Sequence, residues 1–513
     1  MSHWFSILAL ILSFNSVFAE HSAKKFSFRL SGEPETLDWN LAHTSVETHL
    51  MMNMMDGLVT LDNKLNVKPM LATEWAISSD QKVYTFTLRK NVKWSDGVEL
   101  KASHFVDGWK RLLSRETGAS YSYLLFDLVG AQEYFEGKIS DFTKVGVKAL
   151  GAYKLQVTLK NPVPYWITIP SFWVTFPIRS DLIKKYGKKW TKPGNLVTLG
   201  ILVLEKYEID HKLDFKTNPY YWNLKTNVEE WSGIIIKDEN TAVSLYQSGR
   251  LDFVNDLPIL SLKNNQNNPE LKEFAYLKTV YLGFAVTRPE VANAGLRRAI
   301  AMAIDKSKFA EILYGRQKPA SSFVPPPLFA SGSNLGLPFS IERAKNELKK
   351  IGTLPKNIEL LIPNVDKNMM VAQYIQGELK KNLGLEIAIQ TYDYKTYRKH
   401  MESQSESMFM ASWGADYPDP DNFLSVFLSQ SGNNRTLFKD DPYDSWVIQA
   451  RSISNQKKRE ELYEIAQKRM LQDYAPIIPL YYEPNLVYVK PSIEGLLMDP
   501  MNNLDLRQVK VKN

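Results

Sequence analysis

The chain has 513 residues, of which 44% are hydrophobic and 23% are charged, and its formal net charge is +7 at pH 7. This length exceeds one comfortable hydrophobic core, so two or three domains are expected. The 63 basic residues are spread along the chain among 56 acidic residues, which argues against a nucleic-acid-binding stripe. The sequence contains no cysteine, which excludes disulfide bonds, thiolate metal ligands and a cysteine nucleophile.

Residues 1–19, MSHWFSILALILSFNSVFA, have the pattern of a secretory signal peptide. An apolar run from Trp4 to Phe14 precedes the cleavage-like sequence Val17-Phe18-Ala19, although no Lys or Arg stands before the run. After Ala19 no apolar run reaches the roughly 18 residues that a membrane span needs. We therefore expect an exported periplasmic protein. Because cysteine is absent, we expect no lipid anchor on a cysteine.

The first half of the chain is expected to be rich in strands. KKFSFRLSGEP predicts a strand that ends before Gly32, and YKLQVTLKNPVPYW predicts another that is closed by prolines. VYTFTLRKNVKWSDGVEL predicts a hairpin whose turn is Asp96-Gly97. ASHFVDGWKRLLS has helical periodicity, with Ser103 as the expected N-cap. TAVSLYQSGRLDFVND predicts a helix that Gly249 ends, followed by a strand.

From Leu296 onward, predicted helices alternate with predicted strands. LRRAIAMAIDKSKFAEILYG predicts two helices with a break at Asp305, which caps the second. IERAKNELKKIG and MMVAQYIQGELKKNLG are amphipathic helices that end at glycine, and the strands NIELLIP and LEIAIQTYD follow them. QKKREELYEIAQKRMLQDY predicts a last long helix before APIIPLYY. This alternation predicts an α/β architecture.

The segment MASWGADYPDPDNF, from Met410 to Phe423, contains three aspartates and two prolines and is expected to be irregular chain between ordered elements. Such chain often carries a binding surface. From composition alone, Asp416, Asp419 and Asp421 could shape turns, bind a metal, perform catalysis or meet a ligand's positive charge.

The sequence contains few features of an enzyme or of a metal site. The seven histidines are dispersed, and no metalloprotease, serine-hydrolase or phosphate-loop motif is present. DYPDPDNF lacks the glycine of a calcium loop and contains no histidine, although a receptor for a metal complex stays open. A receptor that signals to a membrane sensor or assists folding of exported proteins also stays open.

Several short motifs occur in order along the chain: SGEPETLDWN, DGLVT, LATEWAISSDQKVYTFTLRKNVKWSDGVELKASHFV, NPYYWN, YQSGRLDF, RRAIAMAID and WGADYPDPDNF. Together they resemble the large peptide- and nickel-binding class of extracytoplasmic solute receptors that serve ABC importers. EGKISDFTKVGVKAL, NPVPYW and KKWTKPGN are most similar to the periplasmic oligopeptide-binding branch of that class.

The resemblance implies an α/β fold with two lobes and a hinge, plus an extra α+β domain. Lobe I would comprise residues 20–55, 181–281 and 485–513, the extra domain residues 56–180, and lobe II residues 282–484. The hinge would lie near Tyr281 and Pro484. The implied function is capture of short peptides between the lobes and delivery to an inner-membrane ABC permease. We expect a monomer, and we expect no enzyme activity, cofactor or nucleic-acid partner.

The resemblance also implies roles for individual residues. Asp416 matches the carboxylate that binds the free N-terminal ammonium of a peptide, a charge-assisted hydrogen bond. Asp419 and Asp421 keep the role of turn residues. The peptide backbone would pair as an added strand with HTSVE and with the chain before Asp416. On one side of the peptide, the matching positions are Thr44, Ser45 and Val46. On the other side, Trp413, Gly414 and Ala415 would supply backbone groups. Tyr394 and Trp413 match aromatic pocket positions.

The sequence departs from the branch where the ligand's carboxyl end is expected. Met410 stands in place of an arginine, Asn368 in place of a histidine and Glu483 in place of a tyrosine. Three explanations compete: longer peptides whose end leaves the cleft, a basic or C-terminally blocked ligand, or another anchor such as Arg316 or Lys318. Our hypothesis from Glu483 is a ligand with extra positive charge. The alternative is a receptor of the same fold for a metal complex or a modified or cell-wall peptide.

Two further departures lie outside this end of the cleft. Gly200-Ile201-Leu202 replaces a glycine-alanine-tyrosine turn. A helix start that is arginine-rich in this branch keeps Arg297 but has Gly295 where another arginine is usual.

Overall fold

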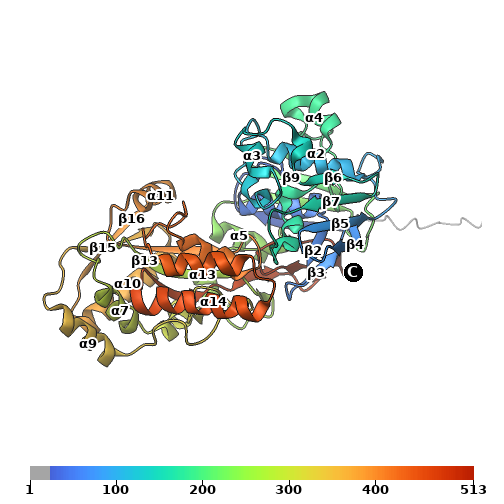
Figure 1. Ribbon diagram of the computed structural model, residues 1–513. Helices are drawn as coiled ribbons and strands as arrows, with labels where there is room; N and C mark the ends of the chain where they lie inside the picture. The colour runs from blue at the N-terminus through green and yellow to red at the C-terminus, as the bar shows by residue number, and fades with distance from the viewer. Residues whose placement is uncertain (1–22, 513) are drawn as a thin grey trace, which may run out of the picture.

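The structure is a computed structural model that describes residues 23–512. Two large sheets organise it into two bodies, joined near the centre of Figure 1. Of residues 1–22, which include the predicted signal peptide, nothing is described. Within residues 23–512, no helix combines the length and apolar character that crossing a bilayer requires.

The first sheet has seven strands from distant parts of the chain. In β1 the alternating Phe26, Phe28 and Leu30 are buried in the core, as the sequence pattern predicts. β1 runs parallel to its neighbours β10 and β11, and the remaining pairs are antiparallel. The strand order is β12 (Leu271–Phe274), β19 (Asn485–Val489), β11 (Phe253–Val254), β1 (Lys25–Leu30), β10 (Glu230–Ile235), β9 (Lys212–Thr217), β8 (Leu202–Glu208).

The second sheet has six strands and is covered by helices on both faces. Its order is β14 (Lys318–Pro319), β18 (Ile477–Tyr482), β13 (Lys278–Phe284), β17 (Met408–Gly414), β15 (Ile358–Pro363), β16 (Ile387–Tyr392). One core contains residues of α7 (Ala294–Ala303), α8 (Phe309–Ile312), α9 (Ile341–Ile351) and α10 (Asp366–Leu383). The other contains residues of α11 (Tyr394–Ser403), α12 (Pro420–Leu424), α13 (Asp441–Arg451) and α14 (Gln456–Lys468).

A third, four-stranded sheet packs beside the first, and both share one continuous hydrophobic core. Its order is β4 (Ala72–Ile77), β5 (Val83–Leu88), β7 (Lys154–Thr158), β6 (Val147–Ala149), and α2 (Ala102–Leu112), α3 (Ala131–Phe135) and α4 (Ser180–Tyr186) accompany it. The remaining helices are α1 (Ser45–Met54), α5 (Glu239–Gln247) and α6 (Ile259–Asn264). The small strand pairs are β2 (Val59–Leu61) with β3 (Val67–Pro69), β20 (Ile493–Glu494) with β23 (Lys510–Val511), and β21 (Leu497–Met498) with β22 (Leu504–Asp505).

The strongest periodic predictions are confirmed. β15 and β16 follow α9 and α10, which end at Gly352 and Gly384, both with positive φ. The chain breaks after α7 at Asp305, whose side chain caps a short 3₁₀ turn that leads into α8. The last helix α14 continues as a π-helix from Arg469 to Tyr474 before β18.

Two local predictions are wrong. β5 does not form a hairpin with the chain after Asp96-Gly97; it pairs with β4 and β7, and the turn closes only the isolated bridge between Lys93 and Glu99. Ser103 is not the N-cap of α2, because the helix begins at Ala102 and Lys101 takes the cap position. For β5, pairing with distant strands decides what the local pattern leaves open.

Candidate functional site

A cleft between the two bodies contains two adjoining cavities. The first, here the small chamber, has a volume of about 150 Å³, and the second, the large chamber, about 600 Å³. Ser45, Tyr276 and Asn502 line both, so the two chambers adjoin. The large chamber lies within the range of roughly 300–1,000 Å³ that is typical of small-ligand sites, and the small chamber is below that range.

Asp416 lines the small chamber as a carboxylate without a cationic partner. β17 ends at Gly414, and the next residue, Ala415, donates its N–H to the carbonyl of Leu277 at 2.9 Å, which fixes the chain leading to Asp416. Oδ2 of Asp416 accepts a hydrogen bond from the hydroxyl of Tyr123 at 3.2 Å, and the N–H of Asp416 donates to Asn422 Oδ1 at 3.1 Å. No Lys, Arg or His within residues 23–512 forms an ion pair with it.

The protein's own environment disfavours the charged form of Asp416. Burial raises the pKa of this carboxyl to about 6, because hydrogen bonds from Tyr123 and Asn422 offset only part of the desolvation. A cation placed in the chamber would supply the missing compensation. The site can therefore bind an ammonium group by a charge-assisted hydrogen bond.

Aromatic side chains form the wall of the small chamber on the side of the third sheet. Phe172 stacks on Trp173 with ring centroids 3.8 Å apart, and Tyr121 meets both rings edge-on at 5.2 and 5.7 Å. The Trp173 indole donates to the carbonyl of Ala42 at 3.0 Å, which ties this wall to the chain before α1. The chamber is thus apolar on one side and anionic on the other, a suitable lining for the amine end of an amino acid.

The predicted pairing segment is a helix start rather than a strand. Thr44 caps α1, and Glu47 reciprocates by accepting the N–H of Thr44 at 2.9 Å, a complete capping box. Ser45 and Val46 therefore lie in the first helical turn, and the expectation that they extend as a strand is wrong. Thr44 and Ser45 line the small chamber, whereas Val46 packs against the core.

The residues before Asp416 divide into lining and support. Gly414 and Ala415 line the small chamber, and a Cβ on Gly414 would stand 3.4 Å from the hydroxyl of Tyr276. The indole of Trp413 does not line it, but donates to Asn422 Oδ1 at 3.0 Å, the same oxygen that holds Asp416. The N–H of Ala415 is engaged within the protein, so it is not free to pair with a ligand.

Asp419 and Asp421 differ from Asp416 because arginines neutralise them. Asp419 caps α12 and forms a buried ion pair with Arg459 at 2.7 Å. Asp421 is fully buried, pairs with Arg451 at 3.1 Å and accepts hydrogen bonds from two tyrosine hydroxyls. The expected turn role holds for Asp419, but Asp421 is the centre of a buried charge network, so the expectation for it is incomplete.

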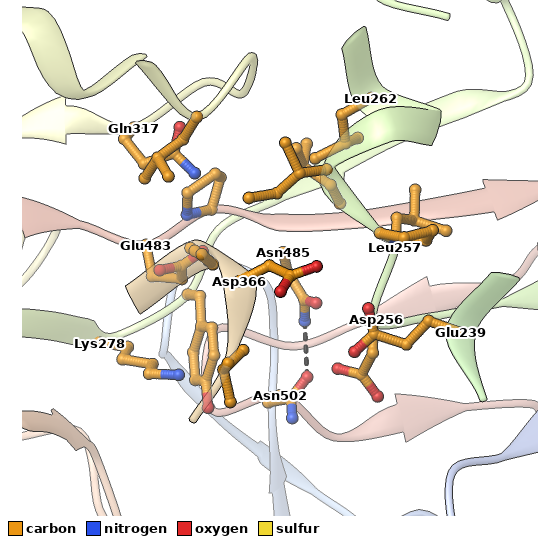
Figure 2. Close-up of a pocket in the computed structure, with 18 of the residues that line it drawn as sticks. Glu239, Asp256, Leu257, Leu262, Lys278, Gln317, Asp366, Glu483, Asn485 and Asn502 are labelled. Carbon is orange, nitrogen blue, oxygen red and sulfur yellow. Dashed lines mark hydrogen bonds and ion pairs between the residues drawn. The ribbon is translucent and has the colours of Figure 1, made fainter. Parts of the chain in front are cut away.

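The large chamber brings together charged residues from both bodies. Figure 2 shows Lys278, Asp366 and Glu483 on one side, with Glu239 and Asp256 on the other. Lys278 begins β13, and its ammonium lies 5.4 Å from the centroid of the Tyr276 ring. Residues 23–512 provide it with no ion pair within 4.0 Å.

Glu483 is compensated within the protein, contrary to the hypothesis that it leaves the cleft acidic. Its carboxylate pairs with the ammonium of Lys367, and its N–H donates to the carbonyl of Lys278 at 3.0 Å. Burial alone would raise the pKa of Glu483, but Lys367 and Lys278 outweigh it and hold that pKa below its usual range. Glu483 therefore does not by itself call for a cationic ligand.

The other residues expected at the carboxyl end do not line either chamber. Met410 is 3% exposed and packs in the core beneath α10, so its assignment to the cleft is wrong. Asn368 lies in the first turn of α10 outside both linings, and Tyr394 begins α11 with 65% of its surface exposed. Of the proposed anchors, Arg316 pairs with Glu273 at 3.1 Å, and Lys318 is exposed in β14.

Sequence reasoning missed the two lysines of the large chamber. Lys278 opens an alternating strand and Lys367 neighbours Asn368, but neither position reveals which way the side chain points. Lys367 and Glu483 are 116 residues apart, so no local pattern joins them. Other lining residues missed are Glu239, Asp256, Tyr276, Asn485 and Asn502.

The structure also shows the surroundings of Gly200 and Arg297, and it bears on the metal interpretation. Gly200 allows the close approach of α1, since a Cβ there would lie 2.3 Å from the carbonyl of Asn53. Arg297 is buried and donates to backbone carbonyls, including that of Tyr474 at 2.7 Å. Within residues 23–512, no group of three or more His, Asp or Glu is placed to hold a metal ion.

Comparison with known proteins identifies the family. A model of the bacterial extracellular solute-binding proteins, family 5 (middle region), matches residues 66–435. The chain belongs to this family. The periplasmic oligopeptide-binding protein OppA of Escherichia coli (strain K12) is 31% identical over 502 residues, which covers 93% of this chain and 91% of that protein.

Solved structures of two similar proteins superpose on this chain over nearly its whole length. The murein tripeptide-binding protein MppA of Escherichia coli superposes with a TM-score of 0.80 at 27% identity, covering 96% of this chain and 99% of that one. OppA of Haemophilus influenzae in complex with the peptide RPPGFSPFR gives a TM-score of 0.79 at 25% identity, covering 96% and 99%. The expected fold class, a two-lobed binding protein with an additional domain, is confirmed.

Proposed function

We propose that this family member is an extracytoplasmic receptor that captures short peptides between its two lobes and delivers them to an ABC importer. The observation that carries the proposal is the unpaired carboxylate of Asp416 in the small chamber. A free N-terminal ammonium supplies the charge and the donors that this carboxylate lacks. The family consists of solute receptors, and relatives named for binding oligopeptides and murein peptides support the peptide as ligand.

Both lobes take part in the proposed capture. Asp416 comes from the second body, whereas Thr44, Ser45 and the aromatic wall come from the first, so a ligand in the small chamber bridges them. A ligand that contacts both lobes binds the closed state better than an open one, and shifts the population towards it. Closure then provides the conformation that a permease can recognise.

We also propose the division of the chain into lobe I (20–55, 181–281, 485–513), an extra domain (56–180) and lobe II (282–484). The membership of the three sheets supports it. A boundary at Tyr281 would cut β13, so the first crossover is better placed before Lys278. Export by the signal peptide, a periplasmic location without a lipid anchor, a monomeric state and the absence of enzyme activity belong to the same proposal.

The test is to identify what the protein binds. The chain is purified without denaturation, and mass spectrometry of its heat-released small molecules is expected to show short peptides with free amino termini. After bound ligand has been removed from the protein, calorimetry should then detect the binding of peptide pools. Nickel and other metal salts are titrated as the comparison. Binding of metal salts alone, with no peptide bound, would contradict the proposal and favour the metal-complex interpretation.

A further inference from the structure

The large chamber contains one cation that the protein leaves uncompensated at close range. Lys278 lines the chamber beside the small one, and no carboxylate within residues 23–512 lies within 4.0 Å of its ammonium. Glu483, the acid next to it, is already paired with Lys367. Burial lowers the pKa of Lys278, but Tyr276, Glu483 and Asp256 together outweigh this effect and raise that pKa above its usual value. The ammonium is therefore charged at neutral pH.

The fold fixes the direction of this side chain. Successive side chains of a strand point to opposite faces. Thr279 is fully buried and donates its hydroxyl to the carbonyl of Phe323 at 2.9 Å on one face, so Lys278 faces the cleft on the other. The carbonyl of Lys278 accepts the N–H of Glu483 at 3.0 Å, which fixes its backbone between β17 and β18.

The same register sets the distance from Asp416. Lys278 stands opposite Gly414 in the antiparallel pair of β13 and β17, where paired Cα atoms are about 5 Å apart. Asp416 follows Gly414 by two residues, which adds at most about 7 Å. The Cα atoms of Lys278 and Asp416 are thus at most about 12 Å apart. An extended peptide advances about 3.3 Å per residue, so about two to four residues cover this span.

We infer that Lys278 binds the C-terminal carboxylate of a short peptide whose ammonium is held by Asp416. This inference rests on the proposed function and adds the ligand's second anchor and its length. Asp416 and Lys278 line adjoining chambers. The negative charge of Asp416 would meet the positive amino end of a peptide, and the positive charge of Lys278 its negative carboxyl end. Peptides longer than about four residues must either bend within the chambers or give up one anchor.

The remaining charges of the large chamber select among such peptides. Four further carboxylates line it and form no ion pair within 4.0 Å in the described part of the chain: Asp238, Glu239, Asp256 and Asp366. An acidic side chain at the end of the ligand would face this excess of negative charge. Short peptides that end in a neutral or basic residue are therefore the expected ligand class.

The test compares free-acid and C-terminally amidated peptides on the stripped, full mature chain. Tri-alanine is expected to bind at least about tenfold more tightly than its amide, because amidation removes one partner of a charge-assisted pair. Lys278→Met should reduce this preference to less than about twofold, whereas Lys278→Arg should keep it. Lys318→Met, a change at an exposed lysine outside both chambers, is the matched control and should behave like the parent.

Each outcome separates this inference from the proposed function. Equal binding of acid and amide by the parent, or a preference that persists in Lys278→Met, overturns the role of Lys278 while peptide binding stands. Loss of the preference in Lys318→Met would move the anchor to that residue. If no peptide of any length binds, the proposed function fails first. A melting temperature within a few degrees of the parent shows that each variant is folded.

Discussion

Asp416 and Asp419 are three residues apart on one loop and have opposite surroundings. Asp419 is 4% exposed and pairs with Arg459, which is equally buried. Asp416 lies in a chamber with a tyrosine hydroxyl and an amide but no cation. The first carboxylate is satisfied by the fold, and the second is left for something outside it. The difference shows that the partner, rather than the residue type, separates structural charge from binding charge.

The largest expected effect comes from breaking the buried pair. Arg459→Met leaves Asp419 buried without its cation and should lower the free energy of unfolding by roughly 3–5 kcal/mol. Chemical denaturation measures this loss. The double variant Arg459→Met/Asp419→Asn should recover a part of it, because the uncompensated charge is then removed. A single variant as stable as the parent would show that the pair contributes nothing.

Removing the unpaired carboxylate should affect binding instead of stability. Asp416→Asn is expected to weaken the binding of free-amine peptides by roughly 2–5 kcal/mol, since the buried ammonium then lacks its anion. Its melting temperature should equal or exceed that of the parent, because the charge has no partner in the free protein. Calorimetry and a thermal melt on one preparation distinguish these effects. A destabilised variant with normal affinity would reverse the two roles.

The pH dependence of binding should follow the same carboxyl. The pKa of Asp416 in the free protein is raised to about 6 by burial, so it becomes protonated as the pH falls through 6. Peptide binding then requires loss of that proton, and affinity should decline by up to about tenfold per pH unit below 6. Above about pH 8 the peptide amine loses its charge. Asp416→Asn, measured at each pH, should lack the decline in peptide affinity at acidic pH. An unchanged pH profile would assign that decline to another group.

The smallest effect is expected from the hydroxyl that supports Asp416. Tyr123→Phe removes the hydrogen bond of 3.2 Å to Oδ2 and should weaken peptide binding severalfold, in line with about 0.5–1.5 kcal/mol for one such bond. Its acidic decline should move to higher pH, because the ionised carboxylate loses a donor. Tyr220→Phe, a half-exposed tyrosine outside both chambers, is a control.

The sequence predicted what depends on neighbouring residues. The helices α9 and α10 and the strands β15 and β16 follow from hydrophobic period and glycine stops, and the Asp305 break follows from capping. The partners of β5 did not follow, because they depend on pairing between distant segments.

The candidate site was predictable only in part for the same reason. Asp416, Gly414 and Ala415 stand in a recognisable motif and line the small chamber together. Met410 belongs to the same strand, but its side chain points into the core, which no motif reveals. The compensation of Glu483 by Lys367 joins residues far apart in sequence, so its charge could not be judged from its position alone.

Blocking the ligand's amine tests most directly whether Asp416 is the ammonium anchor. Affinities of tri-alanine and N-acetyl-tri-alanine are measured by calorimetry for the stripped parent and for Asp416→Asn. Acetylation is expected to weaken binding to the parent at least about tenfold, and the two peptides should differ little in their affinity for the variant. Equal binding of both peptides to the parent, or an undiminished preference in the variant, would contradict Asp416 as the ammonium anchor.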